Sequence, residues 1–123
     1  MKIQKSSEDY LEMILMLKEK KGYARSIDIA SELSVTKPSV SYAMKRLREN
    51  GYITMDADGL ITLTEQGFEI AHRMYNRHKM LTEFLMSIGI DEETAREDAC
   101  KMEHDISEKS FDAMCRFLNW HME

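Results

Sequence analysis

The chain is poor in the residues that mark loops, disulfide frameworks and membrane segments. Its 123 residues include one proline, five glycines and two cysteines. So little proline and glycine favours a mostly helical protein. Two cysteines are too few for the disulfide framework of a small secreted domain. The sequence also contains no apolar run close to the about 20 residues that a membrane-spanning helix requires.

The chain also lacks an apolar leader and the short motifs of common enzymes. Lys2 and Lys5 are followed at once by the polar residues 6–9, unlike a secretory signal, so the sequence predicts a cytoplasmic protein without membrane association. There is no nucleophile elbow, no phosphate-binding loop and no HExxH pair. We therefore do not expect an enzyme.

The net charge of −5 conceals two segments of opposite sign. Residues 18–51 hold eight Lys and Arg against four acidic residues, whereas residues 91–123 hold ten acidic residues against four Lys and Arg. A basic segment suits phosphate groups and an acidic one suits cations. This separation predicts a nucleic-acid-binding part followed by a cation-binding part.

The first half of the chain has the element order of a winged helix-turn-helix. Helical periodicity and end signals predict three helices: one capped by Ser6 or Ser7 and ended by Gly22, one capped by Ser26, and one that starts near Thr36 and Pro38 and ends at Asn50-Gly51. Two β-branched runs at 52–55 and 60–64, joined by an Asp/Gly turn, predict a hairpin. The hairpin would be the wing.

The second half is predicted to be helical throughout. A long helix is expected over about residues 65–88, ended by Gly89, and two further helices are expected after the caps Asp91 and Ser107. The predicted fold class is therefore mainly α with a small β-hairpin wing. We expect a winged helix-turn-helix domain over residues 1–64 and a helical domain over residues 65–123.

The second helix of a helix-turn-helix places its first turns in the major groove of DNA. Residues away from the apolar stripe of this predicted helix can contact phosphates or base edges. With one basic residue that precedes the second helix, the DNA-contact candidates are Arg25, Lys37, Ser39, Ser41, Tyr42, Lys45 and Arg46. The alternative is a basic, solvated helix in an ordinary helical domain, but helix order, turn, wing and charge all favour DNA.

Three stretches carry side chains that bind transition metals. Cys100, Glu103 and His104 have the i, i+3, i+4 spacing that shares one helix face, and Asp9 and Glu12 have i, i+3 spacing. Singly, each has an ordinary explanation, such as packing or a helix-dipole pair. Taken together they form one donor set with sulfur, nitrogen and oxygen atoms. The predicted ligands are Asp9, Glu12, His78, Cys100, Glu103 and His104.

The full chain resembles the diphtheria-toxin-repressor and manganese-transport-regulator family of metal-dependent repressors. The resemblance lies in four segments: Ser7-Glu8-Asp9-Tyr10-Leu11-Glu12, Gly22-Tyr23-Ala24-Arg25, Arg77-His78, and Ala99-Cys100-Lys101-Met102-Glu103-His104. It implies that residues 65–123 both bind metal and form a homodimer. It also implies that the dimer binds a palindromic double-stranded operator to repress metal-uptake genes, with the metal locking the DNA-competent arrangement.

The resemblance does not point to a single metal, because different residues match manganese-type and iron-type members of the family. Asp9, Glu12, His78, Glu103 and His104 match ligands of manganese-type members, whereas Cys100 matches iron-type members, which carry methionine at the position of Asp9. Thr82 and Arg96 stand where iron-type members have further ligands. We expect Mn²⁺ or Fe²⁺, with Co²⁺ or Zn²⁺ able to substitute in vitro. Two competing functions are a metal-independent winged-helix regulator that senses a small molecule or partner, and a metalloenzyme or metal-storage protein.

Overall fold

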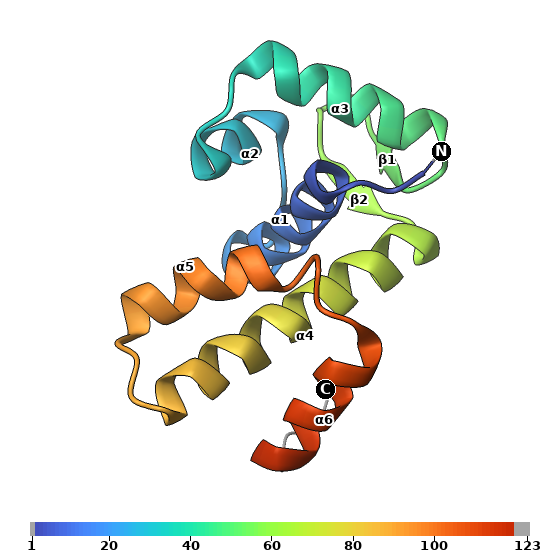
Figure 1. The fold of residues 1–123 in the computed structure, drawn as a ribbon. Helices are drawn as coiled ribbons and strands as arrows, with labels where there is room; N and C mark the ends of the chain where they lie inside the picture. Colours follow the sequence, from blue (N-terminus) through green and yellow to red (C-terminus); the bar gives the residue numbers. More distant parts are fainter. Residues whose placement is uncertain (1, 120–123) are drawn as a thin grey trace. The chain divides into compact units, whose positions relative to one another are not determined.

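The computed structural model describes residues 2–119 (Figure 1). The chain folds into two compact units, Met1–His72 and Arg73–Glu123. Their elements, in chain order, are α1 (Lys5–Lys21), α2 (Ser26–Leu33), α3 (Lys37–Glu49), β1 (Ile53–Met55), β2 (Ile61–Leu63), α4 (Glu65–Ser87), α5 (Glu92–Met102) and α6 (Glu108–Leu118). The predicted fold class, mainly α with one small hairpin, is confirmed. The predicted domain boundary at residues 64 and 65 coincides with the start of α4, while the division into units falls within that helix.

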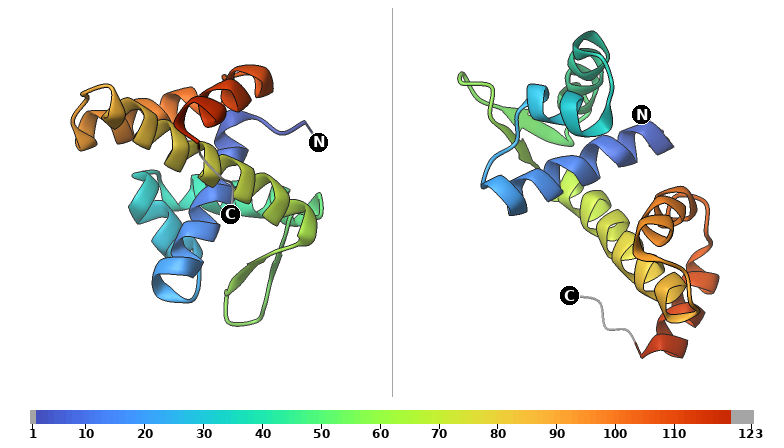
Figure 2. Two further views of the ribbon diagram at one scale, coloured as in Figure 1. Left: turned by 90° about the horizontal axis from the view of Figure 1, so that it is seen from below. Right: turned by 90° about the vertical axis from the view of Figure 1, so that its left-hand side faces the viewer.

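The first unit is a helix-turn-helix followed by a hairpin. Thr36 caps α3 by accepting a hydrogen bond from the Ser39 N–H at 3.3 Å, and a proline lies in the first turn, as predicted. The strands β1 and β2 pair antiparallel, with Ile53 opposite Leu63. Figure 2 shows the hairpin and its turn extending at the edge of this unit. The wing is therefore built as the sequence predicted.

Apolar side chains from every element of the first unit form its core. Leu11 and Ile14 of α1, Val40 of α3 and Ile53 of β1 are almost completely buried. Full burial of one such side chain contributes on the order of 1.5–3 kcal/mol. The core thus leaves the polar face of α3 free to carry function.

Two predicted helix starts differ from the observed ones. Helix α1 begins at Lys5, and its N-cap Gln4 makes no side-chain cap hydrogen bond, so neither Ser6 nor Ser7 is the cap. Arg25 rather than Ser26 occupies the N-cap of α2. In α1 the Glu8 N–H already donates to the Gln4 carbonyl, which extends the helix ahead of both serines.

The second unit is helical within the described residues. Helix α5 runs beside the second half of α4 in both views of Figure 2. Met80 and Leu81 of α4, Ala99 of α5 and Phe111 of α6 form its buried core. The caps Asp91 and Ser107 accept hydrogen bonds from the N–H groups of Thr94 and Ser110, as predicted. No helix in residues 2–119 is long and apolar enough to cross a membrane.

Candidate metal centre and nucleic-acid interface

Three predicted metal ligands converge within the second unit. His78 Nδ1 lies 3.6 Å from Cys100 Sγ and 3.4 Å from Glu103 Oε2. One ligand atom from each of these residues lies within 4.8 Å of the other two. His78 comes from α4 and Cys100 from the end of α5, and the structure brings these two residues together although they lie 22 positions apart in the sequence.

Core packing explains why these side chains meet. Cys100 directly follows Ala99, and His78 lies two residues before Met80. Ala99 and Met80 are fully buried in the same apolar cluster. Packing α5 on α4 through these core residues therefore sets the distance between the imidazole and the thiol.

The predicted helix over Cys100, Glu103 and His104 ends earlier than expected. Helix α5 stops at Met102, Glu103 is its C-cap, and His104 lies in the following turn. Glu103 nevertheless keeps helical dihedral angles, with φ −60° and ψ −27°, so its carboxylate still projects toward the face that bears Cys100. The other carboxylate oxygen, Oε1, lies 3.5 Å from His104 Nε2. The Glu103 carboxylate therefore lies between the imidazoles of His78 and His104. The spacing predicted instead that Cys100, Glu103 and His104 share one face of a helix.

The remaining predicted ligands belong to the first unit. Asp9 and Glu12 lie on α1, where Asp9 is half-buried and Glu12 is buried. Their spacing along the helix allows the two carboxylates to share one face. Their membership in the same metal site stays a prediction.

The three converging atoms fit a transition-metal ion. An imidazole nitrogen, a thiol sulfur and a carboxylate oxygen are the ligand types that bind Mn²⁺, Fe²⁺, Co²⁺ and Zn²⁺, and the thiolate favours the softer ions among them. Glu103 is 1% exposed, and a divalent cation would offset the cost of burying its charge. Cys115 lies outside this group, and burial, followed by the nearby Asp112 carboxylate, raises the pKa of its thiol.

All seven predicted DNA-contact residues are exposed on the first unit, and six of them lie on α3. They are Arg25, Lys37, Ser39, Ser41, Tyr42, Lys45 and Arg46. Arg46 Nη1 donates a hydrogen bond to the Tyr42 hydroxyl at 3.3 Å, and its guanidinium lies 5.9 Å from the centre of the Tyr42 ring. This pairing limits the motion of the Arg46 side chain, which lowers the entropic cost of binding a phosphate.

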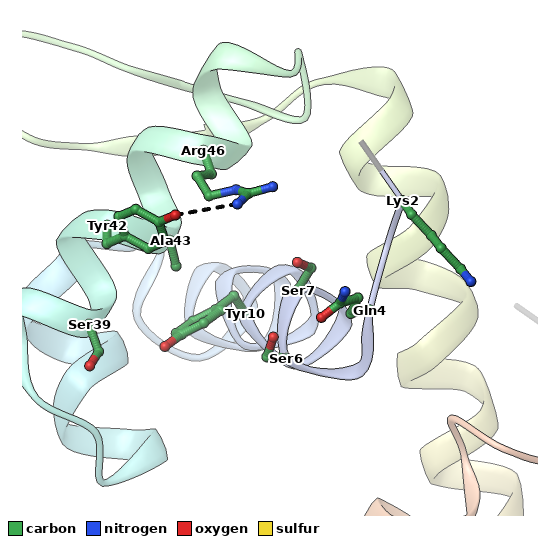
Figure 3. Close-up of a pocket in the computed structure, with 9 residues that line it drawn as sticks. All are labelled: Lys2, Gln4, Ser6, Ser7, Tyr10, Ser39, Tyr42, Ala43 and Arg46. Atoms are coloured by element: carbon green, nitrogen blue, oxygen red, sulfur yellow. Dashed lines mark hydrogen bonds between the residues drawn. The ribbon is translucent and has the colours of Figure 1, made fainter.

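A pocket of about 330 Å³ lies between α3 and the first residues of the chain. Figure 3 shows Tyr42 and Arg46 on one side and residues of α1 on the other. Sequence reasoning missed the other side of this pocket, which is lined by Lys2 and Gln4 ahead of α1 and by Ser6, Ser7 and Tyr10 on α1. A capping role for Ser6 or Ser7 explains a serine at this point of the sequence by itself, so the sequence alone does not indicate that these hydroxyl groups belong to a polar surface beside α3.

The acidic tip of the wing has a structural role. Asp56 Oδ1 accepts hydrogen bonds from the N–H groups of Asp58 and Leu60, both at 2.9 Å. An aspartate that bonds its own turn in this way stabilises a hairpin. The tip thus offers acidic rather than basic side chains to any nearby phosphate.

Family models match both parts of the chain. Residues 2–59 match the N-terminal DNA-binding domain of iron-dependent repressors, and residues 64–122 match the metal-binding and dimerisation domain of the same family. The transcriptional regulator MntR of Bacillus subtilis (strain 168) is 41% identical over 118 residues, which cover 96% of this chain and 83% of that protein.

Solved structures agree with these matches. The manganese regulator SloR is 30% identical, with a TM-score of 0.81 over 98% of this chain and 56% of that one. A manganese-dependent transcriptional repressor in complex with manganese is 25% identical, with a TM-score of 0.85 over 94% of this chain and 53% of that one. The chain thus spans about half the length of these solved proteins.

Proposed function

The chain belongs to the family of iron-dependent repressors, and from this premise we propose that it represses transcription when Mn²⁺ is bound. Membership in a family of metal-dependent, DNA-binding repressors agrees with the predicted function and with the expectation that the chain is not an enzyme. The observation that carries the metal half of the proposal is the convergence of His78, Cys100 and Glu103. As a repressor it would act where the DNA of the cell lies, and we propose the cytoplasm, as the sequence predicted.

The proposed ligand set is the one that the sequence predicted. His78, Cys100 and Glu103 would hold the metal together with His104, and Asp9 and Glu12 of α1 would add hard oxygen ligands. Mn²⁺ is favoured because the chain is similar to regulators described as manganese-dependent. The Cys100 thiolate makes Fe²⁺ the second candidate, because sulfur binds Fe²⁺ better than Mn²⁺.

The division of these ligands suggests how metal controls DNA binding. Asp9 and Glu12 lie in the unit that carries α3, and the other four lie in the unit that matches the dimerisation domain. Without a cation, three carboxylates brought together would repel one another. A bound cation would neutralise this repulsion. The two α3 helices of a dimer could then keep the fixed arrangement that the two half-sites of a palindrome require. The coupling need be only about 1–3 kcal/mol.

The proposed dimer surface lies on the second unit. Met86 and Ile88 near the end of α4 and Phe117 on α6 are exposed, Phe117 by 78%. Exposed apolar side chains of this size are typical of protein interfaces, and the dimerisation model covers all three. We expect Phe117→Ser to yield monomers in sedimentation at concentrations where the unmodified chain is dimeric, with the exposed Glu97→Ser as its control.

The test of the function is an anaerobic DNA-binding titration. An operator is first selected from random duplex DNA in the presence of Mn²⁺, and binding is then measured in chelator and with Mn²⁺, Fe²⁺, Co²⁺ and Zn²⁺ in turn. We expect operator binding only with metal, with Mn²⁺ acting at a free concentration within its cellular range. Tight binding that ignores chelator would favour a metal-independent regulator, and a response to Fe²⁺ alone would reassign the signal.

A further inference from the structure

Arg77 is a buried cation next to the proposed metal ligands. It precedes His78 on α4, and its side chain is only 8% exposed. Its Nη1 donates hydrogen bonds to the main-chain carbonyls of Glu103 at 3.0 Å and Ile106 at 2.9 Å. Its Nη2 donates to Glu108 Oε2 at 2.8 Å. One guanidinium thus contacts three residues of the segment that follows α5.

These contacts close the turn that carries two proposed ligands. The last carbonyls of a helix have no partner within it, and Glu103 is the C-cap of α5. The Arg77 guanidinium supplies that partner for Glu103 and, at the same time, binds Ile106 at the other end of the turn. Glu103 and His104 are therefore tied through their main chain to the helical turn that bears His78.

The chemistry of this position requires arginine. A planar guanidinium can donate to two carbonyls and a carboxylate at once, whereas a lysine ammonium is a point donor on a flexible stem. The guanidinium carbon also lies 5.3 Å from the centre of the buried Phe111 ring, which fixes the plane of the group. Arg77 therefore joins α4, the turn after α5 and the start of α6.

We propose that Arg77 is a positioning residue for the metal centre. It holds the turn from Glu103 to Ile106 so that the Glu103 carboxylate faces His78 and Cys100 before metal arrives. The inference rests on the proposed function only in taking these three residues as metal ligands. Hydrogen-bonding neighbours of ligands commonly contribute about 10- to 100-fold to metal affinity.

The test compares Arg77→Lys with Arg96→Lys in the full chain. Arg96 lies on α5, is largely exposed and pairs with Glu92, so it controls for the substitution itself. Anaerobic Co²⁺ titration, followed by the ligand-field bands and the thiolate-to-cobalt absorption, reports affinity and the bond to Cys100 without reference to DNA. We expect Arg77→Lys to weaken Co²⁺ binding about 10- to 100-fold and Arg96→Lys to leave it unchanged. Saturating metal should restore operator binding to Arg77→Lys.

Other results would overturn the inference. Equal Co²⁺ affinity in folded Arg77→Lys, or a loss that only tracks the unfolded fraction in thermal melts, would reduce Arg77 to a residue of the core. Should Arg77→Lys fail to fold, Glu108→Gln decides. Because Glu108 is 70% exposed, we expect its loss to weaken Co²⁺ binding only about two- to fivefold, and unchanged Co²⁺ affinity would overturn the proposal.

The same samples separate this inference from the proposed function. Operator binding by the unmodified chain that ignores metal would remove the function, while the Co²⁺ comparison would still decide the role of Arg77. Absence of any Co²⁺ binding to the unmodified chain would overturn both.

Discussion

The two units place their functional side chains in opposite environments. On the first unit, Lys37, Tyr42 and Arg46 are exposed above an apolar core that needs none of them. In the second unit, Arg77 and Glu103 are buried beside the small core that holds the helices together. Substitutions on α3 should therefore change DNA binding and leave folding intact. In the second unit, metal binding and folding should change together.

The strongest way to test this contrast is to remove charge from the buried carboxylate. Glu103→Gln keeps the size of the side chain and removes its anionic oxygen. Because Glu103 is a proposed direct ligand, we expect Co²⁺ affinity to fall by more than about 100-fold, the upper range for a residue that only neighbours a ligand. Metal should also cease to stabilise the protein in thermal melts. The exposed Glu93→Gln at the start of α5, the helix that Glu103 caps, is the control, and an unchanged metal response of Glu103→Gln would remove Glu103 from the site.

Gly67 tests whether the first unit can be damaged without affecting metal binding. A Cβ at this helical position would clash with the main-chain carbonyl oxygen of Tyr52. Alanine normally gains about 0.5–1 kcal/mol over glycine within a helix, but overpacking costs about 1–3 kcal/mol. We expect Gly67→Ala to lower the free energy of unfolding by about 0.5–2 kcal/mol, the difference between these terms, in urea titrations.

The effect of Gly67→Ala should be confined to the first unit. Gln66→Ala, at the neighbouring exposed position, should be neutral. Operator binding by Gly67→Ala should weaken near its unfolding transition, while the Co²⁺ affinity of the folded protein stays unchanged. A loss of Co²⁺ affinity at low temperature would show that the two units are not separable in this way.

Much of the fold could be predicted because local signals agreed. The cap Thr36 with Pro38 located α3, and Asp91 and Ser107 located α5 and α6. The end of α5 could not be predicted, since the Cys100, Glu103, His104 spacing fits a helix and Glu103 retains helical angles after the helix has ended. The convergence of the proposed ligands His78, Cys100 and Glu103 could thus be expected from the sequence, but the turn that carries His104 could not.

Arg77 shows the limit of sequence reasoning more clearly. An arginine within an amphipathic helix is ordinarily a solvated residue. Besides the Glu108 carboxylate, its partners here are two main-chain carbonyls in a turn, and no side-chain pattern reveals those. The opposite holds on α3, where the exposed polar residues of a helix with a clear apolar stripe could all be assigned to its outer face.

A smaller effect is expected at Arg46, on the exposed side of the comparison. Arg46→Ala should weaken operator binding and reduce the slope of log affinity against log salt by about 1, because one phosphate contact is lost. Co²⁺ affinity and thermal stability should not change, since the side chain is exposed. Arg96→Ala serves as the matched control from the second unit. An unchanged salt slope would place Arg46 away from the DNA backbone.

The smallest predicted effect concerns the exposed cap of α5. The Thr94 N–H donates to Asp91 and lowers the pKa of its carboxyl below the ordinary 3.8. The pKa of Asp91 is thus lower in the folded than in the unfolded protein. The ionised cap therefore stabilises the fold fully when the pH is above the unfolded-state pKa, and this contribution is lost as the pH falls through the folded-state pKa. Asp91→Ala should therefore lower the Tm of the metal-free protein at about pH 7. The substitution should have less effect at about pH 3, which lies below the intrinsic pKa of Asp, because the cap is then partly protonated.

The exposed Glu97→Ala on the same helix is the control for this pH comparison. A difference in Tm between Asp91→Ala and the unmodified chain that is equal at both pH values would mean that the cap acts without its charge. Because Asp91 lies at the far end of α5 from Cys100, we also expect its loss to leave Co²⁺ affinity within about twofold, a change of roughly 0.4 kcal/mol. A larger change in Co²⁺ affinity would show that the whole of α5, and not only its last turn, holds the proposed ligands in place. Folding and metal binding would then be coupled throughout the second unit.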